Sequence, residues 1–426
     1  MILTRCAALP PLYLLLALIV AALSPAQAQS PQLQAPKAND ARLGGDLVRT
    51  RFVADLSKAV EFEVRTLADP YRVIVDLADV NFQMPPGLGA KGRGLVTGFR
   101  FGNFAKGKSR IVIDTAGPVL VENSLVRPPE GGQPARLIID MARTTRAIFM
   151  KKQAESAADA GPHTVGAAAE PLEALASPPA AAKPVVVIDP GHGGIDPGAM
   201  SAGGVFEKAV VYEFALELKK KLEATKKFEV HLTRDGDVFI PLAERVAFAQ
   251  KKNAGLFISI HADAIDAKHP LLGAKGPQVA QTVRGASIYT LGQQASDAEA
   301  QVIAARENLS DVLAGVGPVV GANDEVSSIL VDLVQRAAKN QAREFSNTLV
   351  SHLRGKTELN MRPQRFANFI VLRAPDVPSV LIELGYLSNV EDEKQLTSEA
   401  WRARTAGAIG AAIVSFFGNA QSRLPF

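Results

Sequence analysis

The stretch Val185-Val186-Val187-Ile188-Asp189-Pro190-Gly191-His192-Gly193-Gly194 decides the fold of the longer part of this 426-residue chain. Four consecutive β-branched residues are typical of a strand that is buried on both faces of its sheet. The proline and glycines that follow end the strand in a tight turn. A strand buried on both faces needs a covering layer on each side, so this stretch predicts a sheet between two layers of helices.

The rest of the second half of the chain repeats this alternation of apolar strands and amphipathic helices. Strands are predicted at residues 185–189, 228–232, 256–260, 286–291, 369–372 and 380–384, and helices at residues 206–225, 243–252 and 398–416. Such alternation is typical of a mostly parallel, twisted sheet with helices on both faces. We therefore predict an α/β domain over residues 184–420.

Residues 45–143 follow a different pattern. Between Val60 and Arg65 apolar and charged residues alternate, which is the period of a strand with one solvated face. Similar runs at residues 72–77, 110–115 and 135–141 are separated by turn signals such as Asp69-Pro70 and Gly131-Gly132. The pattern predicts a small all-β sandwich that precedes the α/β domain.

Two further segments are expected to lie outside both cores. Arg5, an apolar run from Leu12 to Leu23 and the residues Ala26-Gln27-Ala28 form the pattern of a secretory signal peptide over residues 1–28. A membrane anchor is the alternative, but the apolar run is short for a membrane span. Residues 150–183 are rich in Ala, Pro, Gly and Glu, which predicts a flexible linker.

The composition excludes disulfides and thiolate metal sites from the mature chain. The one cysteine, Cys6, lies within the predicted signal peptide. The formal net charge of +4 would suit an anionic polymer such as a cell wall, and it would equally suit simple solubility. We expect no nucleic-acid partner and no stable membrane anchor after signal cleavage.

A helical insertion at residues 295–354 interrupts the alternation and is longer than a crossover between two strands needs. Two apolar stripes are predicted in it, the first at Val302, Ala305, Leu309 and Val312 and the second at Val326, Ile329, Leu330, Leu333 and Val334.

Three of the predicted strands run into residues that can bind a metal or move a proton. His192 follows the first strand, His261 follows the strand at 256–260, and Glu383 follows the run Ser379 to Ile382. Ligands of open α/β sheets bind outside the carboxyl ends of the strands, so the three side chains are expected at one edge of the sheet.

A fourth polar group comes from the helix predicted at residues 206–225. Glu207 shares a face with Val211 and Phe214, and that apolar face should pack on the sheet. A carboxylate buried there needs a cation, because leaving it unpaired would cost several kcal/mol. Two neutral imidazoles and one carboxylate are a ligand set of catalytic zinc sites, so we predict Zn²⁺ on His192, Glu207 and His261.

Glu383 is the candidate acid/base, because a zinc-activated water attacking a carbonyl needs a carboxylate that moves the proton to the leaving nitrogen. Asp189, Asp196 and Asp263 are expected to orient the ligands, and direct coordination by Asp263 stays open. The other histidines, His163, His231, His269 and His352, are expected to be solvated or packed.

The pattern resembles the N-acetylmuramoyl-L-alanine amidases of the type 3 zinc class, which act in cell division of Gram-negative bacteria. The similarity covers residues 184–420. It is carried by four separated motifs, which are Ile188-Asp189-Pro190-Gly191-His192-Gly193-Gly194-Ile195-Asp196-Pro197-Gly198-Ala199, Glu207-Lys208, Ser259-Ile260-His261-Ala262-Asp263 and Leu381-Ile382-Glu383-Leu384-Gly385-Tyr386-Leu387-Ser388-Asn389.

The resemblance implies hydrolysis of the amide between N-acetylmuramic acid and L-alanine of peptidoglycan. It also implies that His192, Glu207 and His261 bind zinc and that Glu383 is catalytic. Residues 45–143 look like the AMIN domain, which is thought to bind peptidoglycan. The family further implies a periplasmic enzyme, enriched at the division septum, whose inserted helix is autoinhibitory and is released by a LytM-domain activator.

By its position in that insertion, Glu307 matches a glutamate that reaches the metal in related enzymes. Because it lies off the predicted apolar stripe, it either occupies the open metal position or points to solvent. Two other functions remain open on the sequence. One is a zinc peptidase or deacetylase that uses the same chemistry, and the other is a catalytically silent wall-binding scaffold.

Overall fold

The computed structural model describes residues 35–85, 87–159, 183–265, 270–275, 278–279, 282–316 and 329–421. The predicted signal peptide, His163, His269 and most of the predicted linker lie outside these residues. Within the described ranges, none of the helices combines the length and apolar character needed to cross a membrane.

The first half of the chain forms an all-β sandwich, as the alternating pattern predicts. One sheet has the strand order β5-β1-β2-β9-β8 and the other the order β3-β4-β7-β6, and the pairs are antiparallel except for β1 with β5. Inward residues such as Phe52, Val75 and Ile139 form the core between the sheets. The strands are β1 Lys37–Gly45, β2 Arg49–Leu56, β3 Phe62–Leu67, β4 Arg72–Ala78, β5 Asn81–Phe82, β6 Val96–Ala105, β7 Lys108–Thr115, β8 Val119–Arg127 and β9 Ala135–Arg143.

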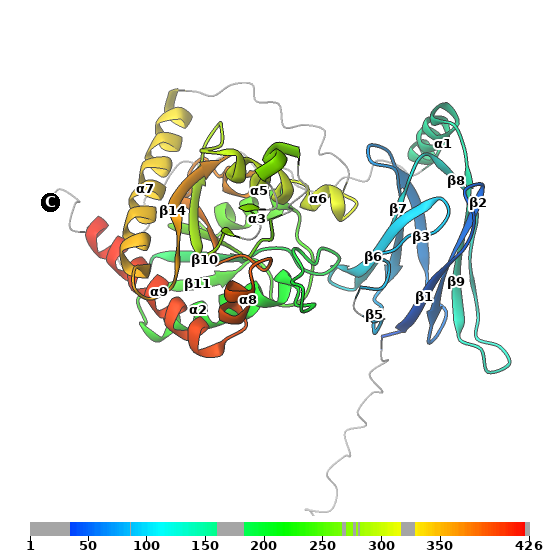
Figure 1. The fold of residues 1–426 in the computed structure, drawn as a ribbon, viewed down its shortest axis with the longest axis horizontal. Coiled ribbons are helices and arrows are strands. Elements are labelled where there is room, and N and C mark those ends of the chain that lie inside the picture. The colour runs from blue at the N-terminus through cyan, green and yellow to red at the C-terminus, as the bar shows by residue number, and fades with distance from the viewer. Residues whose placement is uncertain are drawn as a thin grey trace, which may run out of the picture. The chain divides into compact units, whose positions relative to one another are not determined.

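The second half is an α/β domain around a six-stranded sheet with the order β11-β10-β12-β15-β13-β14 (Figure 1). The four strands β11, β10, β12 and β15 are parallel, whereas β13 pairs antiparallel with β15 and parallel with β14. The strands are β10 Val185–Pro190, β11 Glu229–Leu232, β12 Leu256–His261, β13 Ala286–Leu291, β14 Leu359–Ala367 and β15 Ser379–Glu383.

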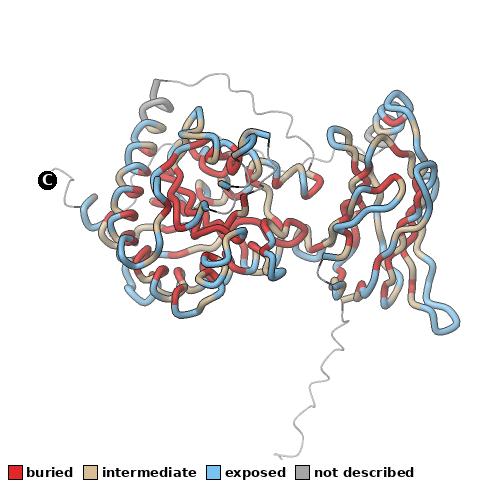
Figure 2. The backbone as a smooth tube through the Cα atoms, viewed as in Figure 1, coloured by how far each residue is buried: buried red, intermediate tan, exposed pale blue. Residues whose placement is uncertain are grey.

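Helices cover both faces of this sheet, which confirms the predicted fold class. Alternate residues of one strand point to opposite layers, so Ile258 packs with α2, α7 and α9 while Phe257 packs with α3 and α5. Figure 2 shows that the buried residues of this domain are concentrated around its central sheet. The helices are α2 Glu207–Ala224, α3 Leu242–Lys251, α5 Ala298–Glu307, α6 Ser310–Leu313, α7 Ile329–Leu353, α8 Val390–Leu396 and α9 Glu399–Gln421.

Helix α7 belongs to the core of the domain although it lies in the predicted insertion. Phe345, Leu349 and Leu353 are fully buried, and the ring of Phe345 contacts that of Phe416 at a centroid distance of 5.3 Å. Burial of each such side chain stabilises the fold by about 1.5–3 kcal/mol. Removal of α7 would therefore damage the core as well as any regulatory function.

Three predictions about local structure are wrong or incomplete. Residues 370–372 form a short 3-10 helix, Ile370–Leu372, and the sheet strand of this region is β14, which alternates apolar and polar residues too weakly to be recognised. The first predicted stripe is wrong in part: Val302 is buried, but Ala305 is exposed, and Leu309, which lies between α5 and α6, is 48% exposed. Helix α1, Arg146–Asp159, occupies the first residues of the predicted linker.

Candidate functional site

The parallel strands bring three candidate residues to one edge of the sheet. In the register of β12 with β15, His261 lies directly opposite Glu383, and β12 also pairs with β10, which leads into His192. All three side chains lie at the carboxyl ends of neighbouring strands, as the sequence predicts.

The turn after β10 presents His192 in a conformation that few residues adopt. His192 has a φ of 57°, in the left-handed region, and the next two glycines also have positive φ. Gly191 and Gly198 leave room for the ligands, since a Cβ at Gly191 would lie 2.3 Å from the imidazole of His261. A Cβ at Gly198 would lie 2.6 Å from the imidazole of His192. Neither position tolerates a side chain without moving an imidazole.

Glu207 is the first residue of α2 and its carboxylate is fully buried. One carboxylate oxygen accepts a hydrogen bond from the backbone N–H of Ala199 at 2.8 Å, and the other accepts one from Ala262 at 2.9 Å. The position at a helix N-terminus further favours the anion. Burial alone would raise the pKa of Glu207, but His192 and His261 hold it well below its ordinary value.

The ligand atoms of His192, Glu207 and His261 lie within 4.8 Å of one another. His192 Nε2 is 3.1 Å from Glu207 Oε2, and His261 Nδ1 is 3.1 Å from Glu207 Oε1. In a tetrahedral zinc site with bonds of about 2.0–2.1 Å, neighbouring ligand atoms are about 3.3 Å apart. The separations in this chain thus match ligands that surround one small ion.

The hydrogen bonding within the cluster is compatible with a metal ion. His261 Nδ1 lies within hydrogen-bond distance of Glu207 Oε1, whereas His192 Nε2 is buried beside Glu207 without a geometric hydrogen bond to any residue that the structure describes. This nitrogen is therefore available to a metal ion. Burial would lower the pKa of His261, yet the carboxylates of Glu307 and Glu207 raise it to about 10. The same negative field would attract a divalent cation.

Of the three aspartates, one contacts a candidate ligand. Asp196 accepts a hydrogen bond from His192 Nδ1 at 2.9 Å, which leaves Nε2 as the nitrogen that could bind a metal. Burial would raise the pKa of Asp196, but His192 and the Ser310 hydroxyl lower it.

The predicted orienting role of Asp189 is wrong. Its carboxylate accepts from Arg245, Thr233 and Ser259 instead of from an imidazole. Asp263 does not join the three ligand atoms either, and its carboxylate forms an ion pair with Arg306.

Glu383 lies beside the three candidate ligands, but only one of its two carboxyl oxygens has a hydrogen-bond partner among the described residues. Its side chain is fully buried, and Oε2 accepts a hydrogen bond from the backbone N–H of Asp263 at 3.1 Å. Oε1 has no hydrogen-bond partner within the described part of the chain. Burial raises the pKa of Glu383 well above its ordinary value, opposed by His261. A carboxyl group whose pKa is raised by burial is suited to general acid/base catalysis.

Glu307, the last residue of α5, points into the cluster and is 5% exposed. Its Oε2 is 3.3 Å from His192 Nε2 and 3.1 Å from His261 Nδ1. These distances are also those of a ligand pair on one ion, so Glu307 occupies the place where a fourth ligand would lie. Because the candidate site residues are at most 6% exposed, substrate cannot reach them while α5 is in this position.

The segment that carries Glu307 is held by polar contacts on several sides. Ser310 donates a hydrogen bond to Asp196 at 2.5 Å, and Asp311 accepts one from the backbone N–H of Leu242 at 2.9 Å. Asn308 donates to Asn368 O and accepts from the backbone N–H of Ile370. The segment of residues 298–313 is thus fixed by directional contacts as well as by apolar packing.

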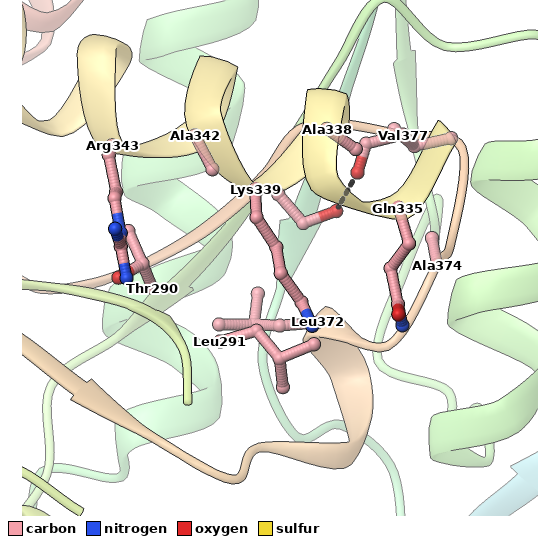
Figure 3. Close-up of a pocket in the computed structure, with 11 residues that line it drawn as sticks. Thr290, Leu291, Gln335, Ala338, Lys339, Ala342, Arg343, Leu372, Ala374 and Val377 are labelled. Carbon is pink, nitrogen blue, oxygen red and sulfur yellow. Dashed lines mark hydrogen bonds between the residues drawn. The ribbon is translucent and has the colours of Figure 1, made fainter. Parts of the chain in front are cut away.

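A hollow between α7 and the loop before β15 is separate from this cluster. It is lined by Lys339, Ala342, Leu291, Leu372 and neighbouring residues (Figure 3), and none of the candidate catalytic residues lines it. The described histidines outside the site behave as predicted: His231 lies near Glu229, and His352 Nδ1 lies 2.9 Å from Thr348 O.

Three residues that support the site were not predicted from the sequence. Arg245 is 1% exposed and donates to Asp189, Pro190 O and His192 O, which fixes the turn that carries His192. A signal for it existed, because Arg245 shares an apolar helix face with Leu242 and Ala249, as Glu207 does on its own helix. Arg306 and Ser310 gave no comparable signal, since such residues are common on solvated helix faces.

The comparisons with known proteins agree with this geometry. A family model described as N-acetylmuramoyl-L-alanine amidase matches residues 186–415, and one described as AMIN domain matches residues 44–141. The chain is 32% identical over 410 residues to N-acetylmuramoyl-L-alanine amidase AmiC of Neisseria meningitidis, with 92% of this chain and 93% of that protein covered. It is 29% identical over 378 residues to AmiC of Escherichia coli, with 87% of each covered.

Among solved structures, the catalytic region is similar to N-acetylmuramoyl-L-alanine amidase AmiC2 of Nostoc punctiforme. The identity is 28% and the TM-score is 0.38, with 56% of this chain and 98% of that chain covered.

The α/β domain brings imidazoles and buried carboxylates together at the carboxyl ends of its parallel strands. This site and the matched families define the class of the protein, which is a hydrolytic enzyme. An AMIN domain precedes its catalytic domain. Within that class the chain belongs to the N-acetylmuramoyl-L-alanine amidase family, whose substrate is peptidoglycan.

The contact between Asp196 and His192 generates a prediction about metal affinity. The variant Asp196→Ala should bind Zn²⁺ about 10–100-fold more weakly, because His192 loses the carboxylate that fixes its ring and tautomer. Competition with a chelator of known affinity measures the change. His231→Ala, at a histidine outside the site, is the control and should bind as the parent does. Equal affinities of Asp196→Ala and the parent would contradict the role of Asp196.

Proposed function

We propose that this chain hydrolyses the amide between N-acetylmuramic acid and L-alanine of peptidoglycan, with Zn²⁺ held by His192, Glu207 and His261 and with Glu383 as the catalytic acid/base. One observation supports the proposal most strongly. The nitrogen and oxygen atoms of three side chains converge at the spacing of a tetrahedral ion, beside a buried carboxyl group with an oxygen that no described residue partners.

When bound, zinc would act as a Lewis acid on the scissile carbonyl and would activate water near neutral pH. The rest of the chemistry belongs to the chain. Asp196 holds His192 in one tautomer, and the N–H groups of Ala199 and Ala262 hold the carboxylate of Glu207 in place. Because these contacts exist before substrate arrives, the site needs little reorganisation during the reaction.

Glu383 performs the proton transfers. Its Oε2 is anchored by the N–H of Asp263, so Oε1 is the oxygen that accepts the proton of the attacking water. The same carboxyl group then gives the proton to the leaving nitrogen of L-alanine, which departs as the amine of a free stem peptide. Water exclusion around the buried carboxyl keeps its pKa high enough for the second step.

The variant Glu383→Gln should retain zinc but lose at least about 100-fold of its hydrolytic rate, because an amide cannot shuttle the proton. Digestion of purified sacculi, followed by mass spectrometry of the products, measures this. Glu229→Gln changes an exposed carboxylate, and the resulting variant should remain active. Release of stem peptides with intact glycan supports the amidase, whereas freed acetate or shortened peptides would instead indicate a deacetylase or a peptidase.

We further propose that the resting enzyme is autoinhibited by Glu307 as a fourth ligand of the metal. The support is the position of Glu307 Oε2 within 3.3 Å of both imidazoles and the burial of the whole site beneath α5. An activator with a LytM-type domain would displace residues 298–313, which we call the inhibitory segment, and open the metal to substrate.

The variant Glu307→Ala should therefore hydrolyse sacculi about 10-fold or more faster than the parent without an activator, because it lacks the competing ligand. Gln301→Ala is the matched control, since Gln301 lies on the same helix but is exposed. Unchanged basal activity of Glu307→Ala would remove the idea. Substitution is a cleaner test than deletion of residues 296–354, which would also remove the core helix α7.

In the cell, we propose export by the signal peptide at residues 1–28 into the periplasm of a Gram-negative bacterium. There the AMIN domain would bind peptidoglycan and enrich the enzyme at the septum, for cell-wall remodelling and daughter-cell separation. Fluorescence imaging of the full chain and of a variant without residues 45–143 tests this. Septal enrichment of both forms would contradict the role of the AMIN domain.

A further inference from the structure

Asp263 is a buried carboxylate that the proposed mechanism does not use. It is 1% exposed, and its backbone N–H binds Glu383 Oε2, so it lies directly beside the catalytic acid/base. Its Oδ1 accepts from the backbone N–H of Ala264, whereas Oδ2 has no hydrogen-bond partner among the residues that the structure describes. Because an unpaired polar atom is costly to bury, we expect a hydrogen-bond donor to approach Asp263 Oδ2 at some stage of the reaction.

In the closed state Arg306 meets the charge of this carboxylate through Oδ1 and leaves Oδ2 without a donor in the described part of the chain. Its guanidinium forms an ion pair with Asp263 Oδ1 and donates to Ala264 O at 2.7 Å. The next residue, Glu307, lies against both imidazoles. Two adjacent residues of the inhibitory segment thus place an oxygen at the metal position and an N–H donor at Asp263.

Opening of the site would remove Arg306 from Asp263. The Ala264 N–H would remain on Oδ1, and Oδ2 would still lack a donor from the residues that the structure describes. A substrate that supplies an N–H at the place of the guanidinium would therefore form a hydrogen bond to a carboxylate, which is stronger than one between neutral groups. Arg306 and Glu307 in the closed state, and the substrate in the open state, would then contact the same two groups, which are Asp263 and the metal.

We propose that Asp263 is a substrate-positioning residue that accepts a hydrogen bond from the first peptide N–H after the scissile amide. The inference rests on the proposed function and adds a stem-peptide contact to it. The distance along the stem peptide favours this N–H. Glu383, which acts on the scissile nitrogen, contacts the backbone of Asp263, and successive residues of a peptide are only about 3.8 Å apart. An ammonium group further along the stem would lie several residues away.

The other explanation is that Asp263 only anchors the inhibitory segment. A full-length chain that carries Arg306→Ala and Glu307→Ala distinguishes the two explanations. The ion pair between Arg306 and Asp263 is already absent in it, so a further effect of Asp263 cannot come from anchoring the segment. We call this chain the opened variant. Asp263→Asn in the opened variant keeps an acceptor for the Ala264 N–H and nearly the same volume, but it removes the charge that faces the substrate.

The experiment combines this substitution with a chemical one in the ligand. Binding is measured by calorimetry on zinc-loaded opened chains that also carry Glu383→Gln, so that no turnover occurs. The ligands are N-acetylmuramoyl-L-alanyl-D-isoglutamine and its twin methylated at the nitrogen between the two amino acids. Steady-state kinetics with the active opened chains gives KM and kcat separately.

With Asp263 present, methylation should weaken binding about 10–100-fold, as expected for loss of a hydrogen bond to a charged group. In the chain that carries Asp263→Asn, the two ligands should bind with affinities within about 3-fold of each other, because the charged acceptor is gone. In the kinetics, Asp263→Asn should raise KM for the unmethylated ligand while zinc content stays unchanged.

An equal methylation effect in both chains would overturn the inference. A loss on Asp263→Asn that occurs only with longer stems that carry a free amine would also overturn it, in favour of an ammonium contact. If the opened variant with Asp263 neither binds nor hydrolyses any muramoyl peptide, the proposed function fails and the inference falls with it.

Discussion

The fully buried carboxylate of Glu207 is the constraint on which the rest of the site depends. An anion at that depth must be matched by cations, and the fold supplies two imidazoles and backbone N–H groups around it. The imidazoles in turn lie where they do because β10 and β12 are parallel neighbours whose ends meet at one edge. A divalent ion at the centre would satisfy all of these groups together, which explains why a polar cluster persists between two apolar layers.

The same electrostatic arrangement would favour the proposed autoinhibited state, in which Glu307 is a fourth ligand of the metal. The centre of the cluster favours an additional carboxylate once a cation is present, and the N-terminal part of the inserted helices carries one in Glu307. The contacts of Arg306 and Ser310 reach two aspartates on either side of the ligands. The proposed closed state would thus be held by groups that the open enzyme uses for other purposes, and displacement of α5 would free the metal position and its surroundings together.

The sequence predicted the features that depend on periodicity and on strand ends. The buried run of valines, the helix face that carries Glu207 and the positions of His192, His261 and Glu383 all follow from local patterns. It failed where tertiary contacts override the pattern. Ile370–Leu372 looks like a strand but forms a 3-10 turn against α3. At the end of α5 the polar Glu307 is buried, whereas the apolar Leu309 that follows the helix is exposed. A helix glutamate that faces a metal has the same local signature as one that faces water.

The most direct test of the account is zinc K-edge X-ray absorption spectroscopy on the purified full chain, with the metal content measured on the same sample. The account predicts one zinc per chain with two imidazole nitrogens at about 2.0–2.1 Å and carboxylate oxygens at about 2.0–2.2 Å. In Glu307→Ala, water should replace one carboxylate oxygen while both nitrogens stay. A chain that binds no zinc, or a spectrum with oxygen ligands alone, would contradict the central claim that these side chains surround one metal ion.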